Sequence, residues 1–346
     1  MGCGAAGFVA PNVVTPGDVP YLSIIFSAFN MKPFAFVFPG QGSQSVGMLD
    51  AWGDHPVVLE TLKEASDALG EDVAGLIKDG PKEALALTTN TQPVMLVAAV
   101  AAYRVWMDET GVAPAAVAGH SLGEYSAMVA AGVLTLAQAA PLVRFRAQAM
   151  QDAVPVGTGA MAAILGMEAA KVIAACAEVT RSFGGDSVEV VEAVNFNDPA
   201  QTVIAGSKAA VEKACEVLKA NGAKRALSLP VSAPFHSSLM KPAAEKLRER
   251  LETVEFGEPK MPLINNIDVA VEVDADRIRD ALYRQAFGPV RWVECVQAIK
   301  GHGISTIVEC GPGKVLAGMV KRIDPGLTGL PLFDPATLAE VKGVLA

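Results

Sequence analysis

The fold is decided by Ala116-Val117-Ala118-Gly119-His120-Ser121-Leu122-Gly123-Glu124-Tyr125, where an apolar run meets a helix-compatible segment across a tight turn. The spacing Gly119-x-Ser121-x-Gly123 is that of a nucleophile elbow, because small residues on both sides of the serine allow a sharp reversal of the chain. Such a turn exposes the serine Oγ above a sheet edge, beside backbone N–H groups and the positive end of a helix. The bare pattern also arises by chance in loops, so the strand-turn-helix context is what favours the elbow.

The composition of the 346-residue chain limits the class of protein. Hydrophobic residues make up 51% of it and charged residues 19%, which allows a large core in one or two domains. With 28 basic and 37 acidic residues, the net charge is −9 and no long basic run occurs, so a nucleic-acid partner is not expected. Residues 125–143, the longest uncharged internal stretch, predict two buried helices joined by a turn and not a membrane span.

The cysteines and the first thirty residues suggest a reducing compartment. The five cysteines are odd in number and contain no C-x-x-C pair, so we expect neither a disulfide framework nor a metal site. The cytoplasm fits this pattern best. Residues 1–30 contain no Lys or Arg and do not resemble a secretory signal or a transit peptide. We expect them to form a disordered N-terminal extension without a chemical role.

Strand-like and helix-like segments alternate along most of the chain, which predicts an α/β fold with a mostly parallel sheet. Within residues 156–229 the order becomes strand, helix, strand, strand, helix, strand, which is the ferredoxin-like pattern. We therefore expect a larger domain of residues 31–155 and 230–346 with a small inserted domain of residues 156–229. One helix is expected to begin after Pro93, and residues 314–323 are expected to form the last helix.

A serine hydroxyl needs a neighbouring base, because it is a weak nucleophile at neutral pH. Of the four histidines, His55 and His302 lie in turn-like contexts that indicate the surface. His120 adjoins Ser121, and neighbours in an extended chain point to opposite faces, so it is better placed to support the elbow. His236, in a loop after a predicted strand, is the candidate base. The alternative for His236 is a buried histidine with a structural hydrogen bond.

Arg146 stands in an otherwise apolar predicted helix of residues 136–150. A buried guanidinium is costly unless it meets an anion, and its planar fork suits two-point contact with a carboxylate. Beside an acylating serine, it suggests an acyl group that itself carries a carboxylate. Extension of the side chain to the surface is the alternative.

Six motifs follow one another along the chain: Phe36-Val37-Phe38-Pro39-Gly40-Gln41-Gly42-Ser43-Gln44, Gly119-His120-Ser121-Leu122-Gly123-Glu124, Arg144-Phe145-Arg146, Asn195-Phe196-Asn197, Pro234-Phe235-His236-Ser237 and Glu309-Cys310-Gly311-Pro312-Gly313. In these motifs and in their order the chain resembles malonyl-CoA:acyl carrier protein transacylases. The likeness extends from about Met31 to near the C-terminus. It implies a hydrolase-like larger domain and a ferredoxin-like small domain, with the site in the cleft between them.

The resemblance also implies a ping-pong reaction with no bound cofactor. Malonyl-CoA would acylate Ser121, and the phosphopantetheine thiol of acyl carrier protein would then take the malonyl group. His236 would act first as base and then as acid, oriented by the backbone carbonyl of Gln285. Backbone N–H groups of Gln41 and Leu122 would form the oxyanion hole.

The resemblance assigns the remaining candidates to substrate binding. Arg146 would hold the malonyl carboxylate, while His120 and Asn197 fall within matched motifs. Phe235 resembles malonyl-selective members, in which its ring would narrow the space near the substrate's α-carbon.

The expected partners are malonyl-CoA and acyl carrier protein, and the expected setting is fatty acid synthesis by a cytoplasmic monomer without nucleic-acid or membrane partners. A malonyl transferase that serves a polyketide synthase is an alternative. Others are a serine hydrolase or thioesterase that passes the acyl group to water, and a carrier-protein docking module with an inactive cleft.

Overall fold

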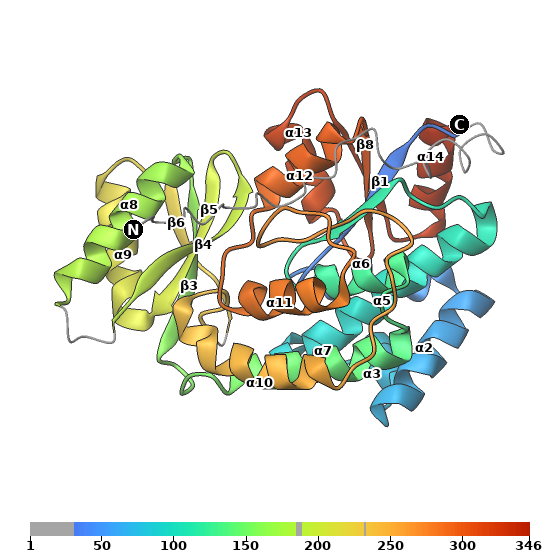
Figure 1. The fold of residues 1–346 in the computed structure, drawn as a ribbon, viewed down its shortest axis with the longest axis horizontal. Coiled ribbons are helices and arrows are strands. Elements are labelled where there is room, and N and C mark those ends of the chain that lie inside the picture. Colours follow the sequence, from blue (N-terminus) through green and yellow to red (C-terminus); the bar gives the residue numbers. More distant parts are fainter. Residues whose placement is uncertain (1–30, 185–188, 232) are drawn as a thin grey trace, which may run out of the picture.

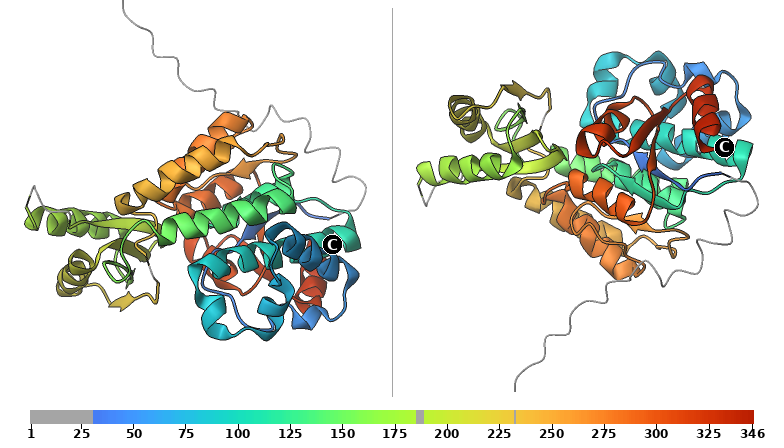
Figure 2. Two further views of the ribbon diagram at one scale, coloured as in Figure 1. Left: turned by 90° about the horizontal axis from the view of Figure 1, so that it is seen from below. Right: turned by 90° about the horizontal axis from the view of Figure 1, so that it is seen from above.

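The computed structural model describes residues 31–184, 189–231 and 233–346, so the predicted N-terminal extension lies outside the described part. Within that part, the strands form a parallel sheet A and an antiparallel sheet B (Figure 1). The predicted α/β class, with one mostly parallel sheet and one ferredoxin-like unit, is confirmed. Figure 2 shows sheet B and its two helices projecting from the larger body around sheet A.

Sheet A is built from short strands, most of whose residues are buried. In spatial order they are β7 (Leu263–Ile264), β2 (Ala116–Gly119), β1 (Phe34–Phe38), β8 (Thr306–Cys310) and β9 (Thr328–Leu332). Every residue of β1, β2 and β8 is buried, which is typical of a parallel sheet with helices on both faces. Because all neighbours run parallel, the carboxyl ends of these strands meet at one edge, where Phe38 pairs with Gly119.

Alternation along β1 divides the core of the larger body into two layers. Phe34, Phe36 and Phe38 point to one face, where their rings pack edge-on with Trp106 and Tyr103 of a long apolar helix. Their neighbours Ala35 and Val37 point to the opposite face, against a second apolar cluster. The helices around sheet A are α2 (Pro56–Leu69), α3 (Val73–Asp79), α4 (Lys82–Ala86), α5 (Thr88–Thr110), α6 (Gly123–Ala131), α7 (Leu136–Gln151), α10 (Lys241–Glu252), α11 (Ala275–Ala286), α12 (Trp292–Gly301), α13 (Val315–Ile323) and α14 (Pro335–Leu345), with the 3-10 turns η2 (Asp50–Trp52) and η3 (Ser238–Met240).

Helix α5 begins earlier than the sequence predicts. We expected it to start after Pro93, but it starts at Thr88 and contains that proline. Proline lacks only one N–H and is tolerated near a helix start, where side chains can hold the first turn. Here the Thr91 hydroxyl lies within hydrogen-bond distance of the Leu85 and Leu87 carbonyls.

The expectation that residues 314–323 form the last helix is wrong. Helix α13 covers Val315–Ile323, but strand β9 and helix α14 follow it. The strand segment Thr328–Leu332 contains a glycine and a proline, which obscure a strand pattern. At the edge of sheet A the proline is tolerated, because one side of an edge strand makes no ladder bonds.

Sheet B has the order expected for a ferredoxin-like unit. Its strands are, in spatial order, β4 (Val191–Asp198), β5 (Gln201–Ser207), β3 (Gly159–Leu165) and β6 (Arg225–Ser228), with all neighbours antiparallel. Helices α8 (Ala169–Ser182) and α9 (Lys208–Ala220) share an apolar cluster with one face of the sheet. Side chains of the other face, such as Met161, share a cluster with Phe235 from the chain that leads back to the larger body.

Sheet B is joined to the larger body along β4. The Phe196 N–H donates to the Val290 carbonyl at 3.0 Å, and the Val290 N–H donates to the Val194 carbonyl at 2.8 Å. The Arg322 guanidinium of α13 also pairs with the nearly buried Asp198 carboxylate at 2.8 Å. These contacts bring the end of β4 next to the turn that follows β2.

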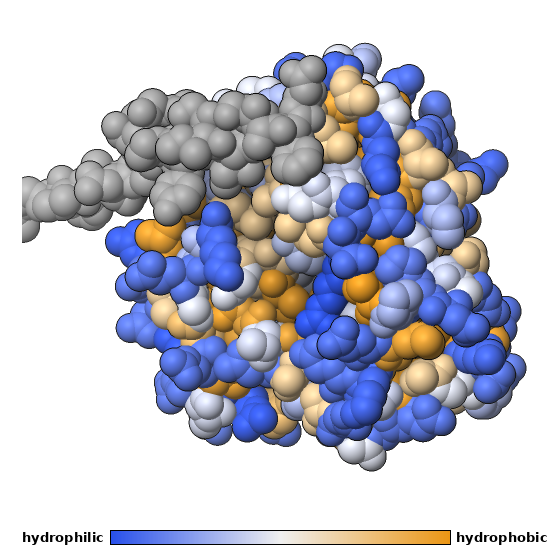
Figure 3. Space-filling view, turned by 90° about the vertical axis from the view of Figure 1, so that its right-hand side faces the viewer, coloured by the Kyte–Doolittle hydropathy of each residue, from blue (hydrophilic) through white to orange (hydrophobic). Residues whose placement is uncertain are grey.

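On the face shown in Figure 3, hydrophilic side chains predominate around the edge and apolar ones appear between them toward the middle. No helix in the described ranges has the length and apolar character needed to cross a bilayer.

Candidate active site

Ser121 lies in a strained turn between β2 and α6. Its φ of 53° is in the left-handed region, which costs a non-glycine residue on the order of 1–3 kcal/mol. A Cβ at Gly119 would lie 1.9 Å from the Gly123 carbonyl carbon, and one at Gly123 would lie 2.0 Å from the Phe38 oxygen. Both positions therefore require glycine, and the turn has the tight geometry of a nucleophile elbow.

His236 faces Ser121 from the loop before η3. Its Nε2 lies 2.7 Å from Ser121 Oγ, and its Nδ1 lies 2.9 Å from the backbone oxygen of Gln285. A carbonyl can only accept, so Nδ1 carries the proton and Nε2 accepts from the serine hydroxyl. Burial, followed by the positive charge of Arg146, lowers the pKa of His236 to about 3. The imidazole is therefore neutral at ordinary pH and can take a proton.

Arg146 of α7 is the third side chain at the serine. It is 1% exposed, and its Nη2 donates to Ser121 Oγ at 3.2 Å and to Gln285 Oε1 at 3.0 Å, while Nη1 donates to Gln92 Oε1 at 2.7 Å. These partners are all uncharged. The buried Nε–H also has no acceptor among the described residues. Because none of the described hydrogen-bond partners carries a negative charge, the guanidinium could pair with an anionic ligand.

The loop after β1 runs beside the elbow. The His120 N–H donates to the Phe38 carbonyl at 2.9 Å. This hydrogen bond holds the start of the loop after β1 next to the turn that contains Ser121. Within the described residues, the backbone N–H groups of Gln41 and Leu122 donate to no protein acceptor. The Gln41 side chain is held by Gln92, whose Nε2 donates to Gln41 Oε1 at 3.1 Å.

The other sequence candidates lie around this centre without touching the serine hydroxyl. His120 Nε2 lies 2.8 Å from the side-chain oxygen Oδ1 of Asn197, near the end of β4. Because Oδ1 accepts, the ring Nε2–H donates this bond, which links the turn after β2 of sheet A to strand β4 of sheet B. Burial lowers the pKa of His120. Phe235 is buried in the apolar cluster beneath sheet B, one residue before His236.

Three buried polar residues at the site were not among the sequence candidates: Gln92, Glu124 and Asn266. Gln92 stands in an apolar helix and Asn266 follows the end of β7, and either observation could have marked the residue. Glu124 lies inside the elbow motif, but its role depends on partners distant in the sequence. Burial raises the pKa of Glu124 to about 7, against hydrogen bonds from Gln285 and Asn266 that lower it.

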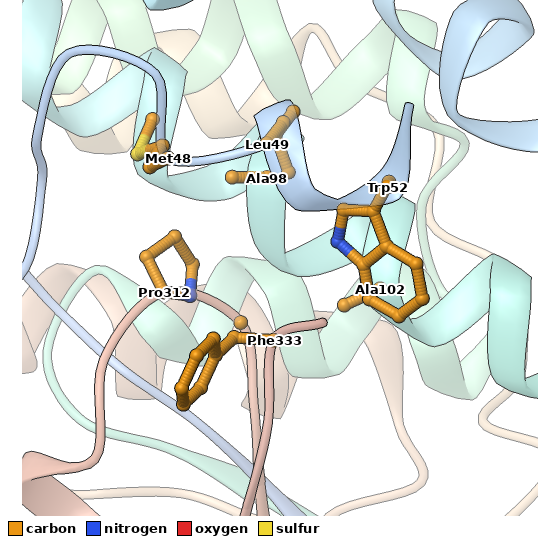
Figure 4. Close-up of a pocket in the computed structure, with 8 residues that line it drawn as sticks. Met48, Leu49, Trp52, Ala98, Ala102, Pro312 and Phe333 are labelled. Carbon is orange, nitrogen blue, oxygen red and sulfur yellow. The ribbon is translucent and has the colours of Figure 1, made fainter. Parts of the chain in front are cut away.

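A small apolar hollow without room for a water molecule lies elsewhere, between η2, α5 and the loop after β8 (Figure 4). The residues that line it are Met48, Leu49, Trp52, Ala98, Ala102, Gly311, Pro312 and Phe333. None of them has a titratable side chain, so the hollow offers no group for acid–base chemistry. Within the described residues, no three His, Cys, Asp or Glu side chains lie together so that they could hold a metal ion.

The arrangement around Ser121 has the parts that acyl transfer requires. A hydroxyl touches a neutral imidazole, the imidazole is oriented by a hydrogen bond at its other nitrogen, and a guanidinium approaches the same hydroxyl. This is the logic of a catalytic triad with a backbone carbonyl in place of the acid.

Comparison with known proteins agrees with this chemistry. The family model described as the acyl transferase domain matches residues 35–323. The chain belongs to the acyl transferase family. The resemblance inferred from its motifs is thereby confirmed.

Relatives of this acyl transferase are named for malonyl transfer. The malonyl CoA-acyl carrier protein transacylase of Escherichia coli K12 is 53% identical over 310 residues, which are 89% of this chain and 98% of the relative. The crystal structure of acyl-carrier-protein S-malonyltransferase from Burkholderia pseudomallei 1710b is 64% identical, with a TM-score of 0.87 over 90% of this chain and all of that one. A type II polyketide acyl carrier protein has been solved in complex with its malonyl transacylase; this relative is 50% identical, with a TM-score of 0.86 over 91% of this chain and 99% of that one.

Proposed function

We propose that this acyl transferase moves the malonyl group from malonyl-CoA to the phosphopantetheine thiol of acyl carrier protein through a malonyl-Ser121 ester. One observation carries the proposal: Ser121 Oγ lies 2.7 Å from the His236 base and 3.2 Å from the Arg146 guanidinium. A nucleophile and a carboxylate-binding cation thus share one small site. The names of the relatives supply the donor and the acceptor.

In the first half-reaction, Ser121 Oγ attacks the thioester carbonyl carbon while its proton passes to His236 Nε2. The negative oxygen of the tetrahedral intermediate is held by the N–H groups of Gln41 and Leu122, which have no other described acceptor. The C–S bond then breaks, and the imidazolium gives its proton to the CoA thiolate. Because the pKa of His236 is lowered to about 3, its protonated form is a strong acid toward a thiolate.

In the second half-reaction the same groups act in reverse. The phosphopantetheine thiol gives its proton to His236 Nε2 and attacks the ester carbonyl carbon. The C–O bond to Ser121 breaks, and the imidazolium returns a proton to Oγ. The Nδ1–H bond to the Gln285 carbonyl keeps the imidazole in one orientation through both halves.

Arg146 supplies the preference for malonyl groups. The distal carboxylate would pair with the guanidinium, whose Nη2 lies beside Ser121 Oγ and whose described partners are all uncharged. A charged pair formed at a buried site adds about 1.5–3 kcal/mol, which an acetyl group cannot obtain. Gln92 and Gln285 hold the guanidinium from the other side. Phe235 is proposed to narrow the space near the α-carbon of the substrate.

The site lies where the two predicted domains meet. Ser121, Arg146 and His236 come from residues 31–155 and 230–346, whereas Asn197, which bonds His120, comes from residues 156–229. This division, a monomeric state, the absence of a bound cofactor and a cytoplasmic location remain predictions. Fatty acid synthesis is the proposed setting, and a polyketide synthase is the second candidate because a relative is complexed with such a carrier protein.

The molecule that accepts the malonyl group, either the carrier-protein thiol or water, distinguishes a transferase from a hydrolase. The test incubates the full chain with radiolabelled malonyl-CoA and measures malonyl-carrier protein and free malonate side by side, with and without holo acyl carrier protein. We expect a malonyl ester on the peptide that contains Ser121 and transfer that is faster than hydrolysis. Faster release of malonate would support the hydrolase, and a protein that forms no malonyl ester would be a docking module.

A further inference from the structure

Glu124 joins two parts of the site that are far apart in the sequence. It is 3% exposed, lies three residues after Ser121, and its Oε2 accepts from the Asn266 N–H at 2.9 Å and from Gln285 Nε2 at 3.0 Å. We propose that Glu124 is a positioning residue for malonyl transfer, which holds the Arg146 guanidinium through Gln285 and the Ser121 turn through Asn266. The inference rests on the proposed function and deepens it, because it names the residue that holds the malonyl-selecting Arg146 in place.

The path to Arg146 depends on which end of the Gln285 amide faces the guanidinium. Gln285 Nε2 donates to Glu124 Oε2 and to the Ser121 carbonyl, each at 3.0 Å, so Oε1 must point the other way, toward Arg146 Nη2 at 3.0 Å. Without the acceptor on Glu124, the amide could rotate and present N–H groups to a cation that only donates. The backbone oxygen of Gln285 also accepts from His236, so a shift of this residue would disturb base and cation together.

The path to Ser121 passes through the amide of Asn266. Its Oδ1 accepts from the Ser121 N–H at 2.8 Å, and its Nδ2 donates to the Gly119 carbonyl at 2.7 Å, so one side chain holds both sides of the elbow. A strained backbone persists only where its surroundings over-determine it. The bond from the Asn266 N–H to Glu124 fixes the segment that carries this side chain.

The hydrogen bonds from the Asn266 N–H and from Gln285 Nε2 both end on Glu124 Oε2. The proposed role therefore requires a hydrogen-bond acceptor at this position and not a negative charge. Glutamine retains an oxygen of the same reach, whereas leucine fills the space and accepts nothing. Glu124→Gln and Glu124→Leu therefore separate acceptor geometry from volume. Glu309 is a matched control, because it is also a buried glutamate, near the end of β8, and its Oε2 accepts from the Ala317 N–H at 2.8 Å within its own junction.

The experiment measures malonyl-enzyme formation by rapid quench and mass spectrometry, together with the ratio of malonyl to acetyl transfer and the melting temperature. For Glu124→Leu we expect an acylation rate about 10–100-fold lower and a lower malonyl-to-acetyl ratio, as for misplaced reacting groups. Glu124→Gln should restore both values to within about threefold of wild type, since it retains the acceptor. Glu309→Leu should lower the melting temperature without changing the ratio.

Folded Glu124→Leu protein with wild-type rate and ratio would overturn the inference, as would an equal change of ratio in Glu309→Leu. If Glu124→Leu does not fold, Asn266→Ala decides, because a wild-type acylation rate in that variant removes the path to Ser121. Measurements on the wild-type protein separate a failure of the proposed function from a failure of the positioning role. Absence of a malonyl ester on wild type would refute the proposed function, whereas normal wild-type activity with unaffected variants refutes only the positioning role.

Discussion

Two strand-to-helix junctions at the same edge of sheet A resemble each other closely and differ in what surrounds them. One leads from β2 through Ser121 into α6, and the other leads from β8 through Cys310 into α13. Both strands pair with β1, and burial raises the pKa of the nearby Glu124 and Glu309 to about 7 in both cases. Each junction also carries an atom that could act as a nucleophile.

The difference lies in the partners that reach each junction. At the first, His236, Arg146 and Gln285 arrive from three other segments and direct polar atoms at Ser121. At the second, Glu309 caps its own helix, and the Cys310 thiol lies in the apolar core with one hydrogen bond among the described residues, to the Ala99 carbonyl of α5 at 3.8 Å. The next two residues, Gly311 and Pro312, line the apolar hollow of Figure 4. Burial raises the pKa of Cys310, so the thiolate does not form. A stronger intrinsic nucleophile is thus inert, while a hydroxyl with polar neighbours can react.

The largest expected effect compares the two nucleophilic atoms. Ser121→Ala should lower malonyl transfer by more than about 10⁴-fold, because it removes the atom that forms the ester. Cys310→Ala should leave the rate within about threefold of wild type, because the buried thiol has no role in the reaction. Intact-protein mass spectrometry after exposure to malonyl-CoA measures both. Loss of the malonyl adduct in Cys310→Ala would show that the second junction takes part.

A smaller effect on the rate is expected when Arg146 is replaced, the cation that lies at the Ser121 junction and not at the Cys310 junction. Arg146→Ala should reduce kcat/KM for malonyl-CoA by about 10–100-fold, which corresponds to the loss of a charged hydrogen bond, and should narrow the gap to acetyl-CoA. Arg144→Ala, on the same helix, is the control, because Arg144 is directed to Glu71 and Asn90 away from the serine. Full malonyl preference in Arg146→Ala would rule out the assigned role.

The smallest expected effect is that of pH on the acylation rate, which should be nearly constant. Desolvation disfavours the charged form of the buried Cys310 thiol and of the buried His236 imidazole. The thiol stays protonated and is unreactive, whereas the imidazole stays neutral and can act as a base. The base is lost only when it is protonated. With a pKa of about 3, acylation should change little between pH 8 and pH 5.

An ordinary histidine, with a pKa of about 6.5, would lose roughly thirtyfold of its neutral form over the same range. Single-turnover acylation rates across this range measure the profile, with melting curves at each pH to identify unfolded protein. A midpoint near 6.5 in folded enzyme would contradict the proposed environment of His236.

Much of the fold could be predicted because its elements have strong local patterns. Strand β1 is a continuous apolar run, the elbow has glycines at the required spacing, and the order of elements in sheet B follows from alternating patterns. The start of α5 and the pair β9–α14 were missed, because proline and glycine obscure the pattern while tertiary contacts support the element.

The sequence by itself determined the class of fold and the family and predicted Ser121 as the nucleophile, because these depend on short patterns of apolar residues, glycines and motif order. Only the tertiary structure decided which atoms meet at Ser121. Contacts such as Glu124 with Gln285 and Ser121 with Asn266 join residues 161 and 145 positions apart. Their geometry depends on the packing of parallel strands whose carboxyl ends converge at one edge, and no local pattern records that convergence.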